Sequence, residues 1–437
     1  MRHDARFLAT EIIRRFNNKI KLDTLFEKIF TKYNPDYRVR FRTIAIVNDI
    51  IRLTGRIDFM IKNVSGKENS QIANPILSIL RIGFYETIMD DHIPDYAAVD
   101  SAVELANKIS NRRSAGFVNA VLRKLVRKKN NDQNWYSSLS DKPEWNSMPT
   151  WIQDRWEKNL GSKGLIKMLK AVNTSPPNFV RIQNQDSTVQ EVIDDLSTDG
   201  IEADFFLESF LKIEGGTAKV LQTKMFKNGV ISIQNPASAG VAKCLDVRPG
   251  DTVVDVCAAP GTKSLYLSSL VGDSGKVLAS DVFKDRVAMG LRDRDRHGRL
   301  NIQWNVKNAA KDDFPMTNHM LIDAPCTGTG VLGRKPDIRW RRKKSDIQEM
   351  SKKQFDILSH CAKFINPNGI IVYATCSIEP EENWDVVDRF LKFNINFCLD
   401  DIHSMVPNSW IDIRGALRTL PYMHGVDGMF AVRLKKS

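Results

Sequence analysis

Hydrophobic residues recur every three or four positions through the first part of the chain, which is the spacing of one face of an α-helix. The clearest stripes are Leu8, Ile12 and Phe16; Ile44, Val47 and Ile51; and Ile76, Leu77, Leu80 and Phe84. Residues 1–128 are therefore predicted to form an all-helical domain. Residues 129–149 lack this period and are rich in Lys, Asn and Ser, so we expect a linker there.

The rest of the chain alternates short apolar runs with helical patterns. Residues 150–235 carry predicted strands at 178–183 and 230–233 and a helix at 189–196, which together indicate a small α/β unit. Residues 236–437 repeat the strand–helix alternation and predict a doubly wound, Rossmann-like α/β domain. We therefore expect a multidomain protein with an all-α N-terminal domain, a small α/β middle unit and a C-terminal α/β domain.

Two predicted strands of the C-terminal domain end in thiols. The strand 319–322 leads into Asp323-Ala324-Pro325-Cys326, and the strand 369–375 leads into Cys376. A buried cysteine is most often only a small hydrophobic residue. In a doubly wound sheet, however, ligands bind at the carboxyl ends of the strands. Cys326, Cys376 and Asp323 are therefore candidates for chemistry at one sheet edge.

A third segment follows the predicted strand 252–254 and reads Cys257-Ala258-Ala259-Pro260-Gly261-Thr262-Lys263. Its Pro-Gly turn allows the backbone to approach a ligand and opens a helix whose free N–H groups face that ligand. Asp281 ends the next strand, at the position where an acid binds ribose hydroxyls in dinucleotide folds. A helix N-cap is the alternative for Asp281.

Along the chain, the segment 257–263 comes first, then Asp323 to Cys326, then Cys376. In this order the three segments resemble the RNA cytosine-5 methyltransferases that use S-adenosylmethionine. The run Phe-Val-Asn-Ala-Val-Leu-Arg at 117–123 resembles the NusB-like RNA-binding domain. With that domain included, the whole chain is similar to the bacterial small-subunit (16S) rRNA cytosine-5 methyltransferase B family. The resemblance implies S-adenosyl-L-methionine as cofactor and 16S rRNA, naked or partly assembled, as partner.

The resemblance also implies roles for the site residues. Residues 257–263 would hold the methionine part of the cofactor and Asp281 its ribose. Cys376 would be the nucleophile that adds to C6 of cytosine. Cys326 would help to remove the C5 proton and release the product. Asp323 would bind the base edge near N3 and N4.

Two more residues are expected near this chemistry. Lys263 would position the target base or lower the pKa of a thiol. Asn308 stands after the predicted strand 302–306, where the family usually has an aspartate that binds adenine. The sequence also departs from the family at Thr262, where a second glycine is common.

Composition limits the other possibilities. The chain has 437 residues, 42% of them hydrophobic, and six cysteines without close pairing, so we expect a globular protein with free thiols in a reducing cytoplasm. The start of the chain lacks the pattern of a signal peptide, and no apolar run approaches the ~20 residues of a membrane span. The seven histidines lack ligand spacing with cysteine, so neither a metal nor a membrane partner is predicted.

Positive charge is concentrated at the N-terminus. Residues 1–130 hold 24 Lys and Arg against 14 Asp and Glu, a net charge of +10 out of +12 for the whole chain. This suits an RNA partner, although a solvated basic surface is the alternative. Residues 333–344 form a second basic stretch around Trp340, which predicts phosphate contacts and base stacking or, alternatively, a solvated loop.

Two other functions remain open at this point. A tRNA cytosine-5 methyltransferase would share the catalytic motifs, although the NusB-like domain favours rRNA. A non-catalytic RNA-binding protein could retain a vestigial methyltransferase fold, although both thiols and Asp323 are present.

Overall fold

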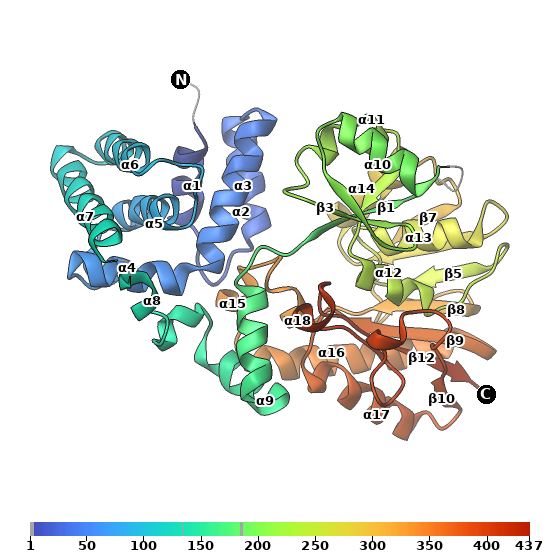
Figure 1. The fold of residues 1–437 in the computed structure, drawn as a ribbon. Helices are drawn as coiled ribbons and strands as arrows, with labels where there is room; N and C mark the ends of the chain where they lie inside the picture. Colours follow the sequence, from blue (N-terminus) through green and yellow to red (C-terminus); the bar gives the residue numbers. More distant parts are fainter. Residues whose placement is uncertain (1–3, 133, 184–186) are drawn as a thin grey trace. The chain divides into compact units, whose positions relative to one another are not determined.

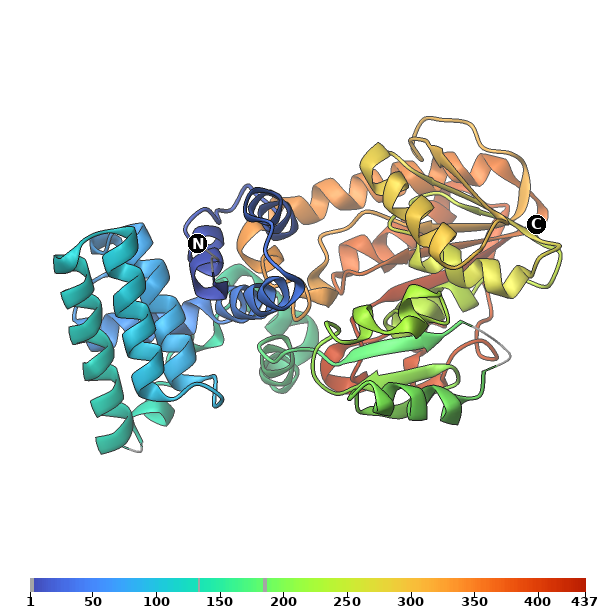
Figure 2. The ribbon, with the colours of Figure 1, turned by 90° about the horizontal axis from the view of Figure 1, so that it is seen from above.

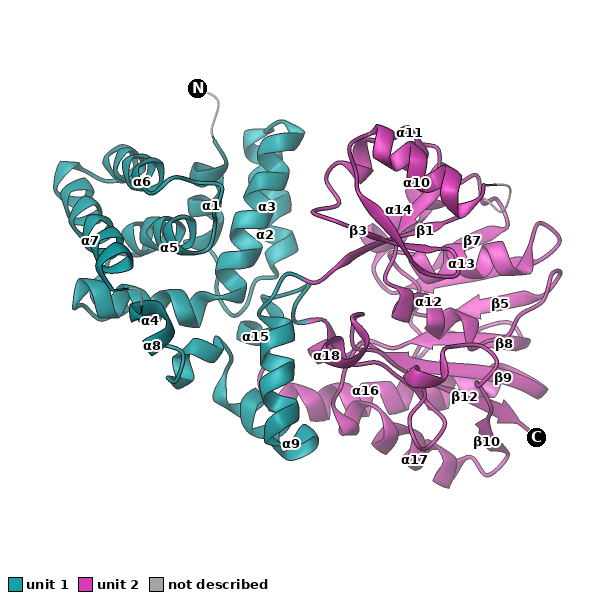
Figure 3. Ribbon diagram, in the orientation of Figure 1, with its two compact units in different colours: residues 1–175, 332–342 teal, residues 176–331, 343–437 magenta. Residues whose placement is uncertain are grey.

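The computed structural model describes residues 4–132, 134–183 and 187–437. The chain divides into two compact units (Figure 3). Unit 1 comprises residues 1–175 together with 332–342. Unit 2 comprises residues 176–331 and 343–437.

Unit 1 is helical, as the apolar stripes predict. Helices α5, α6 and α7 lie side by side (Figures 1 and 2). Polar residues begin several helices: Asp4, Asp36 and Asn111 each accept a backbone N–H bond at their N-caps. The helices are α1 Ala5–Ile13, α2 Leu22–Tyr33, α3 Tyr37–Arg52, α4 Thr54–Ser65, α5 Asn74–Ile88, α6 Asp95–Ile109, α7 Arg112–Asn131, α8 Trp135–Ser138, α9 Thr150–Val172 and α15 Ile338–Arg341.

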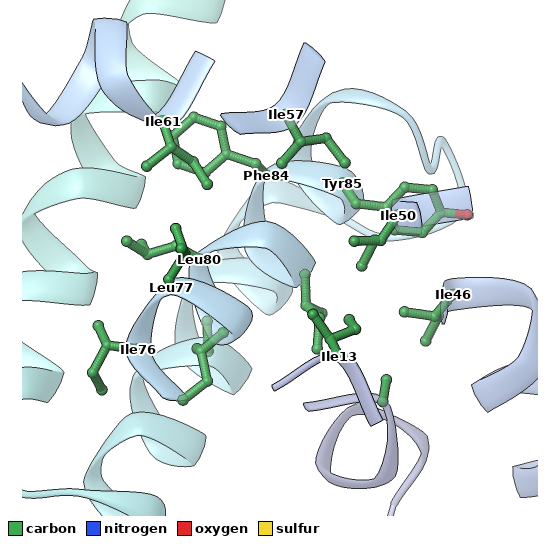
Figure 4. Close-up of a cluster of buried hydrophobic side chains, with 14 of the residues drawn as sticks. Ile13, Ile46, Ile50, Ile57, Ile61, Ile76, Leu77, Leu80, Phe84 and Tyr85 are labelled. Atoms are coloured by element: carbon green, nitrogen blue, oxygen red, sulfur yellow. The ribbon is translucent and has the colours of Figure 1, made fainter. Parts of the chain in front are cut away.

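The predicted stripes meet in one core. Figure 4 shows Ile50, Ile57, Leu80 and Phe84 among the side chains that converge there, and all four are buried. Phe16 lies beyond the end of α1 and is only partly buried against this core. Burial of such side chains stabilises the unit by about 1.5–3 kcal/mol each.

The described residues of 129–149, a segment expected to be a linker, form part of unit 1. They include α8 and the 3-10 helix η2 Pro143–Asn146. Trp135 and Trp145 are buried in the same core, and the Arg56 guanidinium lies 4.4 Å from the centre of the Trp145 ring. The segment contributes two isolated tryptophans to the core. Two isolated residues form no repeating hydrophobic pattern, so the sequence did not predict their burial.

Residues 332–342, which follow the Cys326 loop in sequence, belong to unit 1 (Figure 3). Arg339 is fully buried, and the Trp340 indole donates to the Ile51 carbonyl at 2.8 Å. Both expectations for this stretch, RNA contact and a solvated loop, are therefore wrong for Arg339, which is buried. Trp340 is only partly buried, so the stacking of a base on its ring stays a prediction.

Unit 2 begins with a small antiparallel sheet in the order β2-β3-β1-β4, with α10 and α11 between its strands. The expected strands and helix of this region are present, and β2 and β3 form an additional hairpin. Thr188 and Glu191 form a capping box that starts α10. The elements are β1 Asn178–Ile182, α10 Val189–Thr198, β2 Ala203–Leu207, β3 Phe210–Ile213, α11 Lys224–Lys227 and β4 Ile231–Ile233.

The larger sheet of unit 2 has the order β10-β12-β9-β8-β5-β6-β7, with β11 paired to β12. Strands β9, β8, β5, β6 and β7 are parallel, and β12 and β10 are antiparallel. The strands are β5 Thr252–Asp255, β6 Lys276–Asp281, β7 Ile302–Val306, β8 Thr317–Asp323, β9 Ile365–Thr375, β10 Phe397–Asp400, β11 Leu417–Arg418 and β12 Phe430–Lys436.

Alternate residues of these strands pack against helices on opposite faces, which makes the fold doubly wound. Val253 and Val277 pack with α12 and α13, whereas Val254 and Met320 pack with α16 and α17. The order of strands reverses beside β5, where ligands bind in this architecture. The helices are α12 Pro236–Lys243, α13 Thr262–Val271, α14 Lys284–Arg296, α16 Ser345–Cys361, α17 Trp384–Phe393 and α18 Pro421–His424.

Candidate active site

The two predicted thiols meet at the carboxyl ends of adjacent strands. Strands β8 and β9 are parallel and in register, with Asp323 opposite Ala374. The chain then turns so that Cys326 Sγ and Cys376 Sγ lie 3.2 Å apart. Both side chains are partly exposed. The hydrogen bond from Cys376, with burial adding to it, raises the pKa of Cys326 well above its ordinary value.

Lys263 and Asp323 form an ion pair beside these thiols. Lys263 Nζ donates to Asp323 Oδ2 at 2.7 Å. Burial alone would lower the pKa of Lys263, but the charge of Asp323 and this hydrogen bond together raise it. Lys263 therefore stays protonated. Its charge favours a nearby thiolate, and it holds Asp323 in one orientation.

The loop after β5 carries the predicted cofactor segment. Ala258 N donates to Ser280 O at 2.9 Å, which joins the loop to the end of β6. Gly261 has φ of +111° and is the N-cap of α13. A Cβ at this position would lie 2.8 Å from the Trp304 ring, so glycine is required both for the turn and for the space. Thr262, the departure from the family pattern, is the first residue of α13.

Asp281 lies at the end of β6 and is almost fully buried. Its carboxylate accepts from Phe283 N at 3.0 Å and contacts Arg286 Nη1 at 3.1 Å. Arg286 also donates to the Ala259 carbonyl, so it connects the two cofactor segments. Phe283 and not Asp281 is the N-cap of α14, which disfavours the alternative role for Asp281.

Asn308 makes local contacts. Its Oδ1 accepts from Ala310 N at 3.0 Å, and its own N–H donates to Asp312 Oδ2 at 2.7 Å. The side-chain oxygen is thus used in its own turn. The neighbouring Lys307 N donates to Asp281 O, which brings this turn to the end of β6. The adenine contact of Asn308 stays a prediction.

Asp255 is a buried acid that sequence reasoning did not select. It ends β5, is 0% exposed, and accepts from Ser264 Oγ at 2.7 Å through Oδ2. Its Oδ1 has no hydrogen-bond partner among the residues that the structure describes. Burial raises the pKa of Asp255 to about 7. An unused acceptor beside the loop 257–263 suits a ligand that brings a donor, and the ammonium of a methionine group is one.

Glycines close the thiol loop, and these too were not selected. Gly330 N donates to Cys376 O, and Gly428 N donates to Gly330 O, each at 2.9 Å. A Cβ on Gly330 would lie 2.2 Å from Gly428 O, so only glycine allows this approach. The available signal was the Thr-Gly-Thr-Gly run after Cys326.

A glycine turn after the first strand and a buried acid at the end of the second are shared by dinucleotide-binding folds and by S-adenosylmethionine-dependent methyltransferases. The comparisons with known proteins decide for a methyltransferase. Models of known families agree. Residues 242–435 match the 16S rRNA methyltransferase RsmB/F family, residues 3–127 match the NusB family, and residues 148–217 match the RsmF/B-like ferredoxin-like domain.

Individual relatives extend the match over the chain. The probable ribosomal RNA small subunit methyltransferase B of Bacillus subtilis (strain 168) is 30% identical over 396 residues, 87% of each chain. The chain therefore belongs to the small-subunit rRNA methyltransferase RsmB/F family. It is an rRNA methyltransferase that uses S-adenosylmethionine, and the predicted three-part fold is confirmed.

Solved structures support the same fold. The crystal structure of PH0851 is similar over 100% of both chains, with a TM-score of 0.79 and 27% identity. The structure of NSun6 from Pyrococcus horikoshii with SFG covers 66% of this chain and 98% of its own, with a TM-score of 0.60. At 17% identity this second likeness concerns the fold alone. In the described part of the chain, no helix has the length and apolarity to cross a membrane.

Proposed function

We propose that this protein methylates C5 of a cytosine in 16S rRNA through a covalent bond between Cys376 and C6. The 3.2 Å separation of the two thiols carries this proposal. C5 and C6 are bonded neighbours in the base. Two sulfurs this close together can act on the two carbons from one side of the site, one as nucleophile and the other as base.

The steps follow from the order in which the groups can act. The Cys376 thiolate adds to C6, and the electron pair of the C5=C6 bond makes C5 nucleophilic. S-adenosylmethionine supplies an electrophilic methyl group when it is bound. Cys326, as thiolate, then removes the proton from C5, and that C–H pair restores the C5=C6 bond as sulfur leaves C6.

Asp323 and Lys263 would hold the base for this reaction. Asp323 is fixed by Lys263, and its carboxylate would accept from N4 of cytosine. Uracil presents a carbonyl oxygen there, which a carboxylate repels. The ion pair therefore supports selection of cytosine.

Single thiol variants test the covalent mechanism. Cys376→Ala should abolish both methylation and adduct formation because the nucleophile is lost. Cys326→Ala should accumulate RNA bonded to Cys376 because only release fails. The measurement is a denaturing gel after incubation with S-adenosylmethionine and 16S rRNA or tRNA. Cys398→Ser, at an exposed cysteine of β10, is the matched control and should behave as the unmodified protein.

Each outcome has a defined meaning. Trapping of tRNA in preference to 16S rRNA would replace the proposed substrate. Trapping by Cys376→Ala instead of Cys326→Ala would exchange the two roles. Normal turnover by both variants would exclude the covalent mechanism, and an inert unmodified protein would favour a vestigial fold. Bisulfite sequencing of the product then locates the cytosine.

The cofactor contacts form part of the proposal. Residues 257–263 and Asp281 would bind S-adenosylmethionine, with Asp281 accepting from the ribose hydroxyls. Asp281→Asn keeps an acceptor for Phe283 N but loses the charge, so affinity for S-adenosylmethionine should fall about ten- to a hundredfold. Calorimetry measures this, with the exposed Asp285→Asn as control. Equal affinity in both variants would remove Asp281 from the site.

A further inference from the structure

Among the residues that the structure describes, one buried carboxylate without a cationic partner lies next to both thiol loops. Glu382 ends the 3-10 helix η6 Pro380–Glu382 and is 0% exposed. It accepts from Thr327 N at 2.8 Å, from Ser377 Oγ at 2.6 Å, and also from Thr327 Oγ1. Gln354 Nε2 donates to it at 2.9 Å. All four donors are neutral, although a buried carboxylate costs several kcal/mol without compensation.

Three of the four donors belong to two residues that directly follow the thiols in sequence. Thr327 directly follows Cys326, and Ser377 directly follows Cys376. Gln354 Nε2 also donates to Pro325 O at 2.9 Å, on the other side of Cys326. A single side chain thus contacts the residue after each thiol. A neutral amide at this position could not accept from all four donors.

The surrounding bonds hold this carboxylate in place. The Tyr373 hydroxyl donates to the Glu382 carbonyl at 2.6 Å. The next residue, Asn383, accepts from Thr375 Oγ1 at 2.6 Å and donates to Ser377 O at 2.9 Å. The end of β9 and the turn after it are therefore bonded to the same short segment as the carboxylate.

We propose that Glu382 is a positioning residue that sets the separation of Cys326 and Cys376. The proposal rests on the function proposed above, because the two thiols have separate roles only in that reaction. Glu382 does not touch the reacting atoms. Its four hydrogen bonds fix the two loops relative to each other, and a displacement of about 1 Å in such a site costs up to about a hundredfold in rate.

The first test needs no RNA and measures the two thiols directly. In a Cys398→Ser background, the protein is equilibrated with reduced and oxidised glutathione. Two thiols and one glutathione disulfide then give one protein disulfide and two glutathiones. Glu382→Gln should lower the equilibrium constant for the Cys326–Cys376 disulfide at least tenfold, because the sulfurs are no longer held together. Ser377→Ala removes one donor and keeps the carboxylate. Its disulfide equilibrium constant should therefore lie between that of Glu382→Gln and that of the protein with both Glu382 and Ser377 unchanged.

The second test measures the reaction. Glu382→Gln should lower kcat for methylation about ten- to a hundredfold while KM for RNA changes less than twofold. Glu86→Gln is the matched control, because Glu86 is a buried carboxylate of unit 1 that pairs with Arg6. The Glu86→Gln variant should be less stable than the unmodified protein, but its disulfide equilibrium constant and kcat should be unchanged.

The outcomes separate the two proposals. If Glu382→Gln and Ser377→Ala change only the unfolding midpoint, as Glu86→Gln does, Glu382 is merely structural and the inference is overturned. If Glu382→Gln does not fold, Ser377→Ala decides by the same two measurements. If the disulfide constant falls as expected but the unmodified protein neither methylates nor traps cytosine, Glu382 keeps its positioning role and the proposed function fails.

Discussion

Two stretches of unit 1 are rich in Lys and Arg, but they differ in how their basic side chains are used. Helix α7 exposes Arg113, Lys124 and Arg127, whereas Arg339 in the 332–342 segment is 0% exposed. The number of charged residues does not explain why the basic residues of α7 are exposed and Arg339 is buried. Helix α7 has a regular apolar stripe that packs inward and leaves its basic residues outside. The 332–342 segment has no such stripe, and its surroundings determine where its arginines lie.

Those surroundings are the ends of helices. Arg339 donates to the carbonyls of Arg52 and Val172, the last residues of α3 and α9, at 2.9 and 2.8 Å. It also donates to Ser147 O and Asn173 Oδ1. The last carbonyls of a helix lack partners and carry partial negative charge. Burial lowers the pKa of Arg339 to about 9, so the group stays charged at neutral pH. A buried basic residue can therefore serve as a helix cap rather than an RNA contact.

The largest expected effect comes from removing this cap. Arg339→Met keeps much of the apolar stem but leaves the carbonyls of two helix ends unsatisfied, so unit 1 should lose on the order of 3–5 kcal/mol. Urea unfolding followed by tryptophan fluorescence measures the loss. Lys335→Ala is the control in the same segment, because its exposed ion pair with Asp23 should contribute less than about 1 kcal/mol. Equal effects of the two variants would show that Arg339 is not a cap.

Removing basic residues from α7 should affect stability less than removing the Arg339 cap does. It should affect RNA binding more. The triple substitution Arg113→Ala, Lys124→Ala and Arg127→Ala should change unfolding by no more than about 0.5 kcal/mol. It should weaken rRNA binding and reduce the slope of log affinity against log salt by about 2–3. Filter binding at several salt concentrations measures this, and an unchanged slope would place the RNA contacts elsewhere. Deleting residues 1–128 is a poorer test, because it also removes the Arg52 carbonyl that Arg339 binds.

The sequence predicted what short local signals encode. Strand ends that carry Asp323, Cys326 and Cys376 were identifiable because apolar runs stop there, and parallel strands bring their carboxyl ends to one edge. Lys263 and Asp323 were each identified as site residues, but their ion pair was not predicted. The helical domain followed from its stripes, although Phe16 lies outside the helix that its spacing suggested.

The remaining features depend on partners distant in sequence. Glu382 lies in Glu379-Pro380-Glu381-Glu382, a composition typical of a solvated surface. Its burial depends on donors from Thr327 and Gln354, which are 55 and 28 positions away in sequence. The burial of Arg339 also depends on distant partners. Its acceptors at Val172 and Arg52 are 167 and 287 positions away in sequence. No local pattern specifies such pairs, and charged residues are expected outside by default.

The inclusion of residues 332–342 in unit 1 also constrains the order of events during synthesis. The helix ends at Arg52 and Val172 are made early, but Arg339 leaves the ribosome only after the middle sheet and strands β5 to β8. At about 5–20 residues per second, the delay between residue 175 and residue 342 is roughly 10–30 s. During that interval the N-terminal helices lack their final hydrogen-bond donor. Unit 1, although most of it precedes unit 2 in sequence, must therefore complete its folding after most of the unit 2 chain has emerged.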